Sequence, residues 1–556
     1  MWEALGEQTV DVLIIGGGIN GAGIARDAAK RGLSVALVDM NDLASGTSSS
    51  SSKLIHGGIR YLEQLEFGLV FESVSERRIL MDIAPHLVNP LGFLFPVFKE
   101  SRRALTTISA GMWLYEGLSL FRSPKRHKTL NRNQVKQAEP ALDVSSLKGA
   151  PLYYDCSTDD ARMTLESALD AAQHGAIIAT WVKATSFLRD EHGRVCGCTV
   201  MDTLHPERPT RDVRASVVIN ATGPWTDRIL RMSQGDHQSL LRPTKGIHAV
   251  VTRQKLPVNN AVVCFHPEDG RVLFAIPWGE HTYLGTTDTD FEGDPALVCA
   301  DIDDINYLLD VSNVYFPEHQ LTHEDIISTW AGLRPLIRPV HKHGKEVDES
   351  SVSREHQILV SEDGIITVAG GKLTTYRKMS REVMETTLKV MRLSNTLPDR
   401  ALTEAPTDRD PLPGAVGWPE DDDHQAVANQ VMAEAQGKIS AQSARHLADT
   451  YGMRGLDIAR LVAADPSLNQ PLCEGRPEIL AQVHYAVSTE LAATVTDVLE
   501  RRTQLFYRAH DQGLQAAHLV ADTMRHLLGW DDAMTRQMIQ SYQEAVALSR
   551  QWKQAL

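Results

Sequence analysis

The stretch VDVLIIGGGINGAGIARDAAKRGLSVALVDMNDL, Val10 to Leu43, decides the fold of this 556-residue chain. Its apolar runs and glycines predict a strand over Val10–Ile15, a turn, an amphipathic helix that ends near Lys30, and a second strand over Ser34–Val38. This order of elements is typical of the first unit of a Rossmann-like sheet. The sequence therefore predicts an α/β fold, α+β overall, that starts from this unit.

Three glycines in the turn have different roles in a dinucleotide site. Gly16 permits the tight turn, Gly18 lets a pyrophosphate approach the helix N-terminus, and Gly21 allows close packing of helix on strand. Asp39 lies 18 residues after Gly21, where a carboxylate can accept hydrogen bonds from ribose hydroxyls. A glycine-rich turn without a ligand is the alternative, but the strand, the helix and the terminal acid together favour bound NAD or FAD.

Two later segments repeat the succession of strand, glycine and helix. ASVVINATGPWTDRIL contains a β-branched strand over Ser216–Asn220, and GIITVAGGKLTTYRKMSREVMETTL runs from Gly364 to Leu388. Each places open backbone at the carboxyl end of a strand, where doubly wound sheets bind ligands. Either segment taken alone is consistent with an ordinary connection. A fingerprint at the start of a long chain, completed by later segments, favours FAD over NAD.

A run of serines precedes a histidine and two glycines in GTSSSSSKLIHGGIRYLE, Gly46 to Glu63. A linker of small polar residues is one interpretation. The other is an active-site loop, because Gly57 and Gly58 allow the backbone to lie flat against a flavin ring while the His56 imidazole faces a substrate.

Six motifs in order carry a family resemblance: IIGGGINGAGIARDAAKRGLSV, TSSSSSKLIHGGIRYLE, NATGPW, IPWGEHTYLGTTDTD, GLRPL and GGKLTTYRK. Together they resemble the FAD-dependent, quinone-linked (aerobic) glycerol-3-phosphate dehydrogenases, densely from Asp11 to Met379 and more weakly beyond. The resemblance implies hydride transfer from sn-glycerol 3-phosphate to FAD, giving dihydroxyacetone phosphate. Asp39 replaces the glutamate common in that family and keeps a carboxylate for the ribose on a shorter side chain.

The resemblance also implies which residues contact FAD. The serine run fits the family pattern T-S-S-x-S-S-K from Thr47 to Lys53, with Ser50 as the free position. The implied cofactor residues are Gly16, Gly18, Asn20, Gly21, Asp39, Thr47, Ser48, Ser52, Lys53, Leu54, His56, Gly57, Gly58, Val182, Thr222, Gly223, Trp225, Gly371, Lys372, Leu373 and Thr374.

Alcohol oxidation needs a base for the hydroxyl proton and a group that holds the far end of the substrate. Histidine is the natural base near neutral pH, and the resemblance indicates His56 first and His248 second. One guanidinium group can bind two phosphate oxygens at once, which points to arginines as the residues that hold the phosphate. An isolated arginine is more often simply exposed. The implied substrate and catalytic residues are Arg60, Tyr61, His248, Arg334, Arg354 and Lys372, in addition to His56.

The domain organisation follows from these motifs and from a Pro- and Asp-rich stretch near residue 410. The resemblance implies a FAD-binding domain of the glutathione-reductase/amino-acid-oxidase type, and the alternating segment RVLFAIPWGEHTYLGTT indicates antiparallel strands in the substrate domain. The predicted parts are a FAD domain of residues 9–90, 150–230 and 355–400, a substrate domain of 91–149 and 231–354, a linker at 403–423 and a C-terminal helical domain at 424–556.

Composition excludes several classes of protein. The net charge of −15 argues against nucleic-acid binding, and no window approaches the roughly 20 apolar residues of a membrane span. The start of the chain lacks the basic and small-residue features of a signal peptide. Six scattered cysteines suit neither a disulfide framework nor a zinc or iron–sulfur site. We expect a reduced protein on the cytoplasmic side, without a metal.

One segment is locally basic in this acidic chain. Lys99 to Lys128 holds seven Lys or Arg against two Glu, and these charges bracket an apolar and aromatic core. Such chemistry suits a segment at a membrane interface, whereas a helix buried in the protein with charged ends is the alternative. The family resemblance favours the first interpretation. We therefore expect residues 98–128 to contact anionic lipid, as a peripheral protein on the cytoplasmic face of the inner (plasma) membrane, where quinone is the electron acceptor.

Other functions stay open from the sequence alone. An oxidase that uses oxygen, or an amine or amino-acid oxidase, would share the fold, although several arginines favour a phosphorylated substrate. A non-catalytic flavin scaffold or a flavoprotein acting on RNA belongs to a different class, and the net charge weakens the second. A homodimer is consistent with the sequence and is not indicated by any particular motif.

Overall fold

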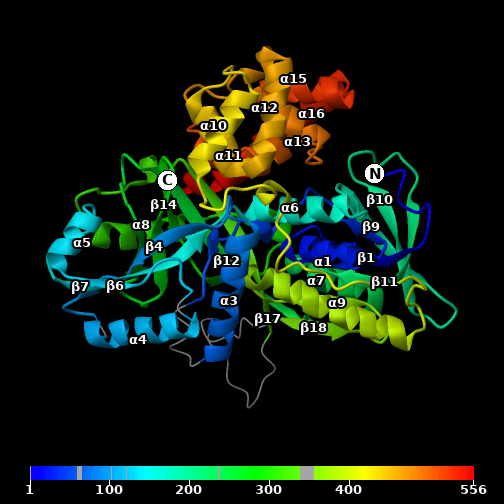
Figure 1. Ribbon diagram of the computed structural model, residues 1–556, viewed down its shortest axis with the longest axis horizontal. Helices are drawn as coiled ribbons and strands as arrows, with labels where there is room; N and C mark the ends of the chain where they lie inside the picture. The colour runs from blue at the N-terminus through cyan, green and yellow to red at the C-terminus, as the bar shows by residue number, and fades with distance from the viewer. Residues whose placement is uncertain (1, 59–65, 102, 121, 236–237, 339–355) are drawn as a thin grey trace.

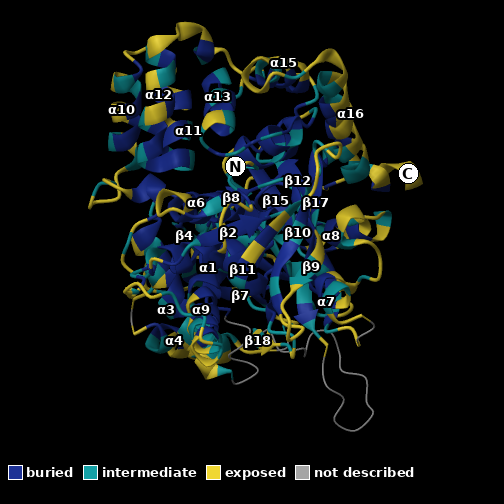
Figure 2. Cartoon of the chain, turned by 90° about the vertical axis from the view of Figure 1, so that its right-hand side faces the viewer, coloured by how far each residue is buried: buried dark blue, intermediate teal, exposed yellow. Residues whose placement is uncertain are grey.

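Two β-sheets lie side by side in the computed structural model, and a helical domain packs above them (Figure 1). The structure describes residues 2–556 except 59–65, 102, 121, 236–237 and 339–355. Buried residues fill the sheets and the helix faces that cover them, whereas the outer helices carry most of the exposed residues (Figure 2). The parallel sheet expected from the first glycine motif is present.

The first sheet joins segments that are far apart in the sequence. Its main path is β18-β19-β11-β1-β2-β8, with β10 paired to β11 and β9 paired to β10. The strands are β1 (Val10–Ile15), β2 (Val35–Val38), β8 (Ile177–Ala179), β9 (Val182–Arg189), β10 (Val195–Asp202), β11 (Arg211–Asn220), β18 (Gln357–Val360) and β19 (Ile366–Ala369). β1 pairs in parallel with β2 and β11, and the predicted second strand begins one residue late, at Val35.

Both faces of β1 are buried, which explains its continuous apolar sequence. Val12 and Ile14 pack with helices on one face, and Leu13 and Ile15 pack with β9 and β10 on the other. The helices are α1 (Ile19–Lys30), α6 (Asp160–Gln173) and α9 (Tyr376–Leu393), and α7 (Thr226–Gln234) follows β11. The carboxyl ends of β1, β11 and β19 therefore meet at one edge of the sheet.

The second sheet has eleven strands and is largely antiparallel, as the alternating segments predict. β14 pairs antiparallel with β15, as predicted for the segment RVLFAIPWGEHTYLGTT. The strands are β3 (Leu54–Ile55), β4 (Asn89–Leu94), β5 (Val97–Phe98), β6 (Lys128–Leu130), β7 (Leu147–Ser157), β12 (Leu241–Thr252), β13 (Ala261–Phe265), β14 (Val272–Trp278), β15 (His281–Gly285), β16 (Thr289–Asp290) and β17 (Ser328–Ile337). Its helices are α3 (Phe67–Ile83), α4 (Leu105–Leu118), α5 (Arg132–Ala138) and α8 (Ile302–Tyr315).

The C-terminal part is helical and has an apolar cluster of its own. Its helices are α10 (His424–Glu434), α11 (Ala441–Tyr451), α12 (Gly455–Ala464), α13 (Leu480–Ser488), α14 (Leu505–Arg508), α15 (Ala516–Leu528) and α16 (Asp532–Ser549). The stretch expected to link it, 403–423, packs against the first sheet's helices: Arg26 donates to the carbonyls of Thr407 and Asp410 at 3.2 and 2.7 Å.

Buried ion pairs fasten the helical domain to the first sheet. Asp497–Arg502 forms a π-helix turn, from which Arg501 and Arg502 both reach Asp42, at 2.7 and 2.6 Å. Burial alone would raise the pKa of Asp42, but the two guanidinium groups outweigh it and lower that pKa. Asp42 lies three residues after Asp39, so the helical domain fixes the loop that follows β2. Among the described residues, no helix combines the length and hydrophobicity needed to cross a bilayer.

Candidate active site

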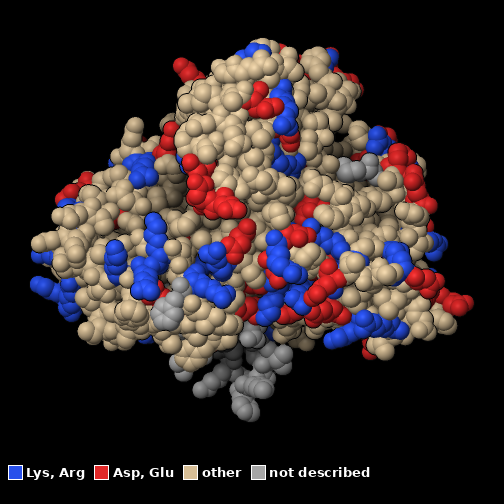
Figure 3. All heavy atoms as spheres, in the orientation of Figure 1, with Lys and Arg blue, Asp and Glu red and all other residues tan. Residues whose placement is uncertain are grey.

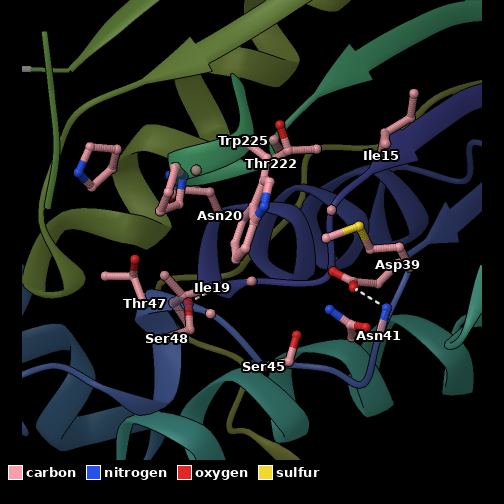
Figure 4. A pocket seen from close by; sticks show the side chains of 18 of the residues that line it. Ile15, Ile19, Asn20, Asp39, Asn41, Ser45, Thr47, Ser48, Thr222 and Trp225 are labelled. Carbon is pink, nitrogen blue, oxygen red and sulfur yellow. Dashed lines mark hydrogen bonds between the residues drawn. The ribbon is translucent and has the colours of Figure 1, made fainter. Parts of the chain in front are cut away.

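A cavity opens where the carboxyl ends of β1, β2, β11 and β19 meet, and its wall comes from parts of the chain that are far apart in the sequence (Figure 4). Many of the residues expected to contact FAD line it. They are Gly16, Gly18, Asn20, Asp39, Thr47, Ser48, Val182, Thr222, Gly223, Trp225, Gly371, Lys372 and Leu373.

The glycine turn forms a close-fitting cradle at the start of α1. Gly16 adopts a φ of +111°, and a Cβ on Gly21 would lie 1.8 Å from the Gly16 carbonyl oxygen. The N-cap residue, Gly18, has no side chain that could cap the helix. The amide of Ile19 donates instead to Ser48 Oγ, at 2.9 Å. A helix N-terminus without bulky side chains suits a pyrophosphate. These residues fit the adenosine and diphosphate part of FAD.

Asp39 sits at the other end of the cradle. Its carboxylate accepts from the amides of Gly17 and Asn41, at 2.6 and 2.8 Å, and its side chain faces the cavity (Figure 4). Burial raises its pKa to about 6, although both backbone amides act in the opposite direction. A carboxylate held in this way has lone pairs left for ribose hydroxyls.

We expect Asp39 to make the FAD-free protein less stable as pH rises. The folded chain holds a proton up to a pKa of about 6, whereas the unfolded chain releases it near 3.8. The free energy of unfolding should therefore decrease as pH rises from the lower of these pKa values to the higher. We expect a decrease of about 1–2 kcal/mol, which is less than the full pKa difference implies, because solvent in the cavity screens the carboxylate. Denaturant unfolding of FAD-free wild type and Asp39→Asn at pH 4.5 and 7 measures it. The variant should gain relative to wild type at pH 7, and a difference that does not change with pH contradicts the assignment.

The serine run is held in place by hydrogen bonds and is not a free linker. The amide and the hydroxyl of Ser51 both donate to Asp160 Oδ2, at 3.0 and 2.7 Å. Lys53 Nζ donates to Asp160 Oδ1 at 2.7 Å and to the Ser49 carbonyl at 2.8 Å, and its side chain is buried. Lys53 therefore holds the loop's shape, and its ammonium group points to Asp160 at the start of α6.

The same loop bonds to the second sheet. Trp330 Nε1 donates to the Ser51 carbonyl at 3.1 Å, and the Tyr283 hydroxyl donates to the Ser52 carbonyl at 2.8 Å. Thr47 Oγ1 donates to the Leu333 carbonyl at 2.6 Å. The loop thus ties the cofactor cavity to β17, the strand that carries Arg334.

His56 follows this loop and is held by a threonine of the third glycine segment. Its amide donates to Thr374 Oγ1 at 3.2 Å, and the Thr374 hydroxyl lies 3.3 Å from the His56 carbonyl. Thr374 is two residues from Lys372, which lines the cavity. The structure therefore brings the His56 backbone next to the segment that carries Lys372.

His248 is a buried, tightly packed ring. Its Nε2 lies 2.9 Å from Ser52 Oγ, and the ring stacks on Trp330 with centroids 4.7 Å apart. Burial, and then the positive charges of Arg334 and Lys53, lower the pKa of His248 well below its usual value. The imidazole is neutral at physiological pH.

Arg334 projects from β17 and is anchored by an acid. Its Nη1 donates to Asp288 Oδ1 at 2.8 Å, and its Nη2 donates at 3.0 Å to both Thr286 Oγ1 and the Thr287 carbonyl. The guanidinium lies over Gly246, where an added Cβ would lie 2.4 Å from Arg334 Nη2. Arg334 is flanked by Leu333, which bonds Thr47, and by Pro335, which lines the cavity.

Some expected site residues lie away from the cavity wall or outside the described part of the chain. In the part that the structure describes, the remaining members of the cofactor set are not among the residues that line the cavity: Gly21, Ser52, Lys53, Leu54, His56, Gly57, Gly58 and Thr374. Arg60, Tyr61 and Arg354 lie outside the described residues.

Several cavity residues were missed by sequence reasoning. Asn41 and Ser45 belong to the loop after Asp39, Arg228 lies in the first turn of α7, and Pro335 follows Arg334. Helical spacing offered a signal for Arg228, because it follows Trp225 by three residues and so shares its face. Pro335 comes from the second sheet and lies in the motif GLRPL, but nothing in that motif shows that it meets the glycine segments.

Comparison with known proteins places these features in a family. A family model described as FAD dependent oxidoreductase matches residues 11–377, and one described as the C-terminal domain of alpha-glycerophosphate oxidase matches residues 405–535. Glycerol-3-phosphate dehydrogenase 2 of Mycobacterium tuberculosis is 39% identical over 548 residues, which are 98% of this chain and 89% of that protein. Aerobic glycerol-3-phosphate dehydrogenase of Staphylococcus saprophyticus is 36% identical over 529 residues, which are 95% of this chain and 92% of that protein.

Solved structures show the same likeness. The glycerol-3-phosphate dehydrogenase of Bacillus halodurans, complexed with FAD, matches with a TM-score of 0.79 and 31% identity over 98% of this chain and 96% of that one. L-alpha-glycerophosphate oxidase of Mycoplasma pneumoniae matches with a TM-score of 0.53 at 19% identity, over 73% of this chain and 99% of that one, which indicates a shared fold alone.

Proposed function

The chain belongs to the FAD-dependent glycerol-3-phosphate dehydrogenases, and we propose that it oxidises sn-glycerol 3-phosphate to dihydroxyacetone phosphate and delivers the electrons to a membrane quinone. The observation that carries the proposal is the bond from Thr47 to the Leu333 carbonyl. One loop thereby sets both the cofactor cavity and the strand of Arg334. A phosphate bound by Arg334 is thus held next to the cavity.

The proposed roles follow from the chemistry of each group. The residues that line the cavity would hold FAD, which would supply the acceptor for the hydride of the substrate carbon. Arg334 binds the phosphate, with its guanidinium oriented by Asp288 and Thr286. His56 takes the hydroxyl proton, and Lys372 supplies a positive charge at the cavity wall.

His56 is favoured over His248 as the base. His248 is buried, stacked on Trp330 and depressed in pKa, so it is a weak base that cannot move toward a substrate without disturbing the sheet. His56 is only partly buried and lies at the end of the fixed serine loop. We therefore assign His248 to the shape of the site and the proton transfer to His56.

One experiment tests the reaction and separates it from its main competitor. Purified holoenzyme is mixed with sn-glycerol 3-phosphate without oxygen, and the flavin absorbance is followed. Bleaching supports the reaction, and an unchanged spectrum refutes it. Adding oxygen or a quinone analogue to the reduced enzyme then compares the acceptors. Rapid peroxide formation at the expense of quinone reduction would favour a glycerol-3-phosphate oxidase.

Access to a lipid-dissolved quinone motivates a membrane-facing surface at α3 and α4. Trp113 and Leu114 of α4 are 62% and 46% exposed, and Phe67 and Phe71 of α3 are 39% and 45% exposed. Exposed basic residues flank this apolar surface: Lys99, Arg103, Arg122, Lys125, Arg126 and Lys128. Figure 3 shows Lys and Arg across the lower half of one face, with mostly uncharged atoms below them at the lower left, where α4 lies in Figure 1. Such a surface suits anionic lipid on the cytoplasmic face.

We expect the protein to sediment with anionic liposomes at low salt. Charge reversal of the basic group after α4 should abolish this binding, because these side chains attract the anionic headgroups. High salt should weaken the binding of wild type, because it screens the same attraction. The variant changes Arg122, Lys125, Arg126 and Lys128 to Glu. Binding is measured as the pelleted fraction at low and high salt.

A matched control reverses four surface arginines on the helical domain, at the opposite end of the molecule (Figure 1). It changes Arg445, Arg460, Arg525 and Arg536 to Glu, and it should pellet like wild type. Wild type that stays in the supernatant at both salts, or equal losses in the two variants, would show that α4 does not anchor the protein.

A further inference from the structure

Helix α4 carries a buried tyrosine in addition to its exposed apolar face. Met112, Tyr115 and Glu116 are buried, whereas Trp113 and Leu114 face outward. The Tyr115 hydroxyl donates to the carboxylate of Asp155 on β7, with distances of 2.8 and 3.0 Å to its two oxygens. A surface helix thus reaches into the interior of the second sheet.

The same hydroxyl accepts a hydrogen bond from the turn that carries His56. The amide of Gly57 lies 3.0 Å from the Tyr115 hydroxyl and 3.3 Å from Asp155 Oδ1. A Cβ on Gly57 would lie 2.2 Å from that hydroxyl and 2.4 Å from Val74 Cγ1 of α3. Only glycine lets the turn approach α3 and α4 this closely, so turn and tyrosine form one fitted contact.

The contact is embedded in a buried polar cluster. Arg77 of α3 forms an ion pair with Asp155, and its Nη1 also donates to the Tyr115 hydroxyl at 3.3 Å. The side chains of Arg77 and Asp155 are 0% and 2% exposed. Burial, and then the Asp155 carboxylate, raise the pKa of Tyr115 well above its usual value, so the hydroxyl keeps its proton and remains a donor to Asp155. In such buried surroundings the loss of a hydrogen bond is costly.

His56 is therefore held from two sides. On one side, the Thr374 hydroxyl bonds the amide and the carbonyl of His56. On the other side, the Tyr115 hydroxyl of α4 accepts from the amide of Gly57. We propose that Tyr115 is a positioning residue, whose hydroxyl fixes the His56–Gly57 turn and so aims the imidazole at the substrate. The inference rests on the proposed function in giving His56 its role as base. A consequence is that the helix with the exposed Trp113 also sets the geometry of the active site.

The test compares Tyr115→Phe with Tyr153→Phe in the FAD-loaded enzyme. Tyr153 lies in the same cluster, its ring 6.0 Å from that of Tyr115, and its variant leaves both bonds of Tyr115 intact. Tyr115→Phe should slow flavin reduction by sn-glycerol 3-phosphate about tenfold, with substrate affinity changed less than about twofold, since one positioning bond is lost and no substrate contact. Tyr153→Phe should stay near the wild-type rate.

Hydrogen exchange of the peptide that covers residues 54–58 provides a readout independent of activity. It should quicken in Tyr115→Phe and not in Tyr153→Phe. Unchanged reduction and exchange in Tyr115→Phe, or equal losses in both variants, would overturn the inference. If Tyr115→Phe does not accumulate with FAD, wild-type exchange decides: a protected Gly57 amide supports the bond, and exchange as fast as in exposed loops overturns it. Wild-type flavin that the substrate fails to bleach would refute the proposed function alone, because hydrogen exchange still tests the positioning.

Discussion

A Gly18→Leu variant is expected to fold and to purify without FAD. Gly18 has an extended backbone, with φ −74° and ψ −179°, so leucine causes no backbone strain there. A Cβ would lie 3.1 Å from Ser48 Oγ, and the rest of the side chain would enter the cavity at the N-terminus of α1. That is the space the pyrophosphate needs. Visible absorbance relative to protein absorbance measures the bound flavin, and circular dichroism reports folding.

Gly68→Leu is the matched control, because Gly68 is exposed in α3 and a Cβ there meets nothing within 4 Å. It should purify with wild-type flavin content. Gly18 is a better test than its neighbours, since Gly16 has a positive φ and Gly21 touches the Gly16 carbonyl, so changes at either would also damage the fold. A yellow Gly18→Leu protein with full flavin content would mean that the diphosphate is bound elsewhere.

The parts of the site that the sequence predicted are those in which local pattern decides structure. Strand, glycine turn and helix are local features, so the cradle from Val10 to Lys30 and the loops after Asn220 and Ala369 were predictable. The two-sheet arrangement came with the family resemblance. Spacing alone does not say that β11 pairs with β1 across about two hundred residues of chain.

The parts that could not be predicted depend on side chains brought together by the tertiary fold. Lys53 is predicted to contact the cofactor, and the sequence gives no sign that its ammonium group bonds to Asp160, an acid 107 residues further along. The bond from Gly57 to Tyr115 gives no sequence signal, because a buried tyrosine in an apolar segment looks like ordinary core. The pairing of Asp42 with Arg501 and Arg502 likewise joins residues more than four hundred positions apart.

Arg334→Ala is expected to lower kcat/KM for sn-glycerol 3-phosphate by at least tenfold while FAD stays bound. A charged hydrogen bond contributes about 1.5–3 kcal/mol, which corresponds to roughly 10- to 150-fold in affinity for the transition state. Arg334 itself is not part of the cavity wall in the described chain, so flavin content should not change. Steady-state kinetics and the flavin spectrum measure the two effects.

His56→Ala should instead slow flavin reduction with a smaller change in substrate affinity, as loss of a base would.

Asp288 makes this prediction sharper. Its carboxylate pairs with Arg334 at 2.8 Å and is only 17% exposed, so Arg334→Ala leaves a largely buried negative charge where the phosphate should bind. Part of the loss is then repulsion, and the double variant Arg334→Ala/Asp288→Asn should recover activity relative to Arg334→Ala alone. Arg338→Ala, at an exposed arginine four residues further along, is the control and should keep wild-type kinetics. Wild-type kinetics in Arg334→Ala, or a double variant weaker than the single one, would place the phosphate away from β17.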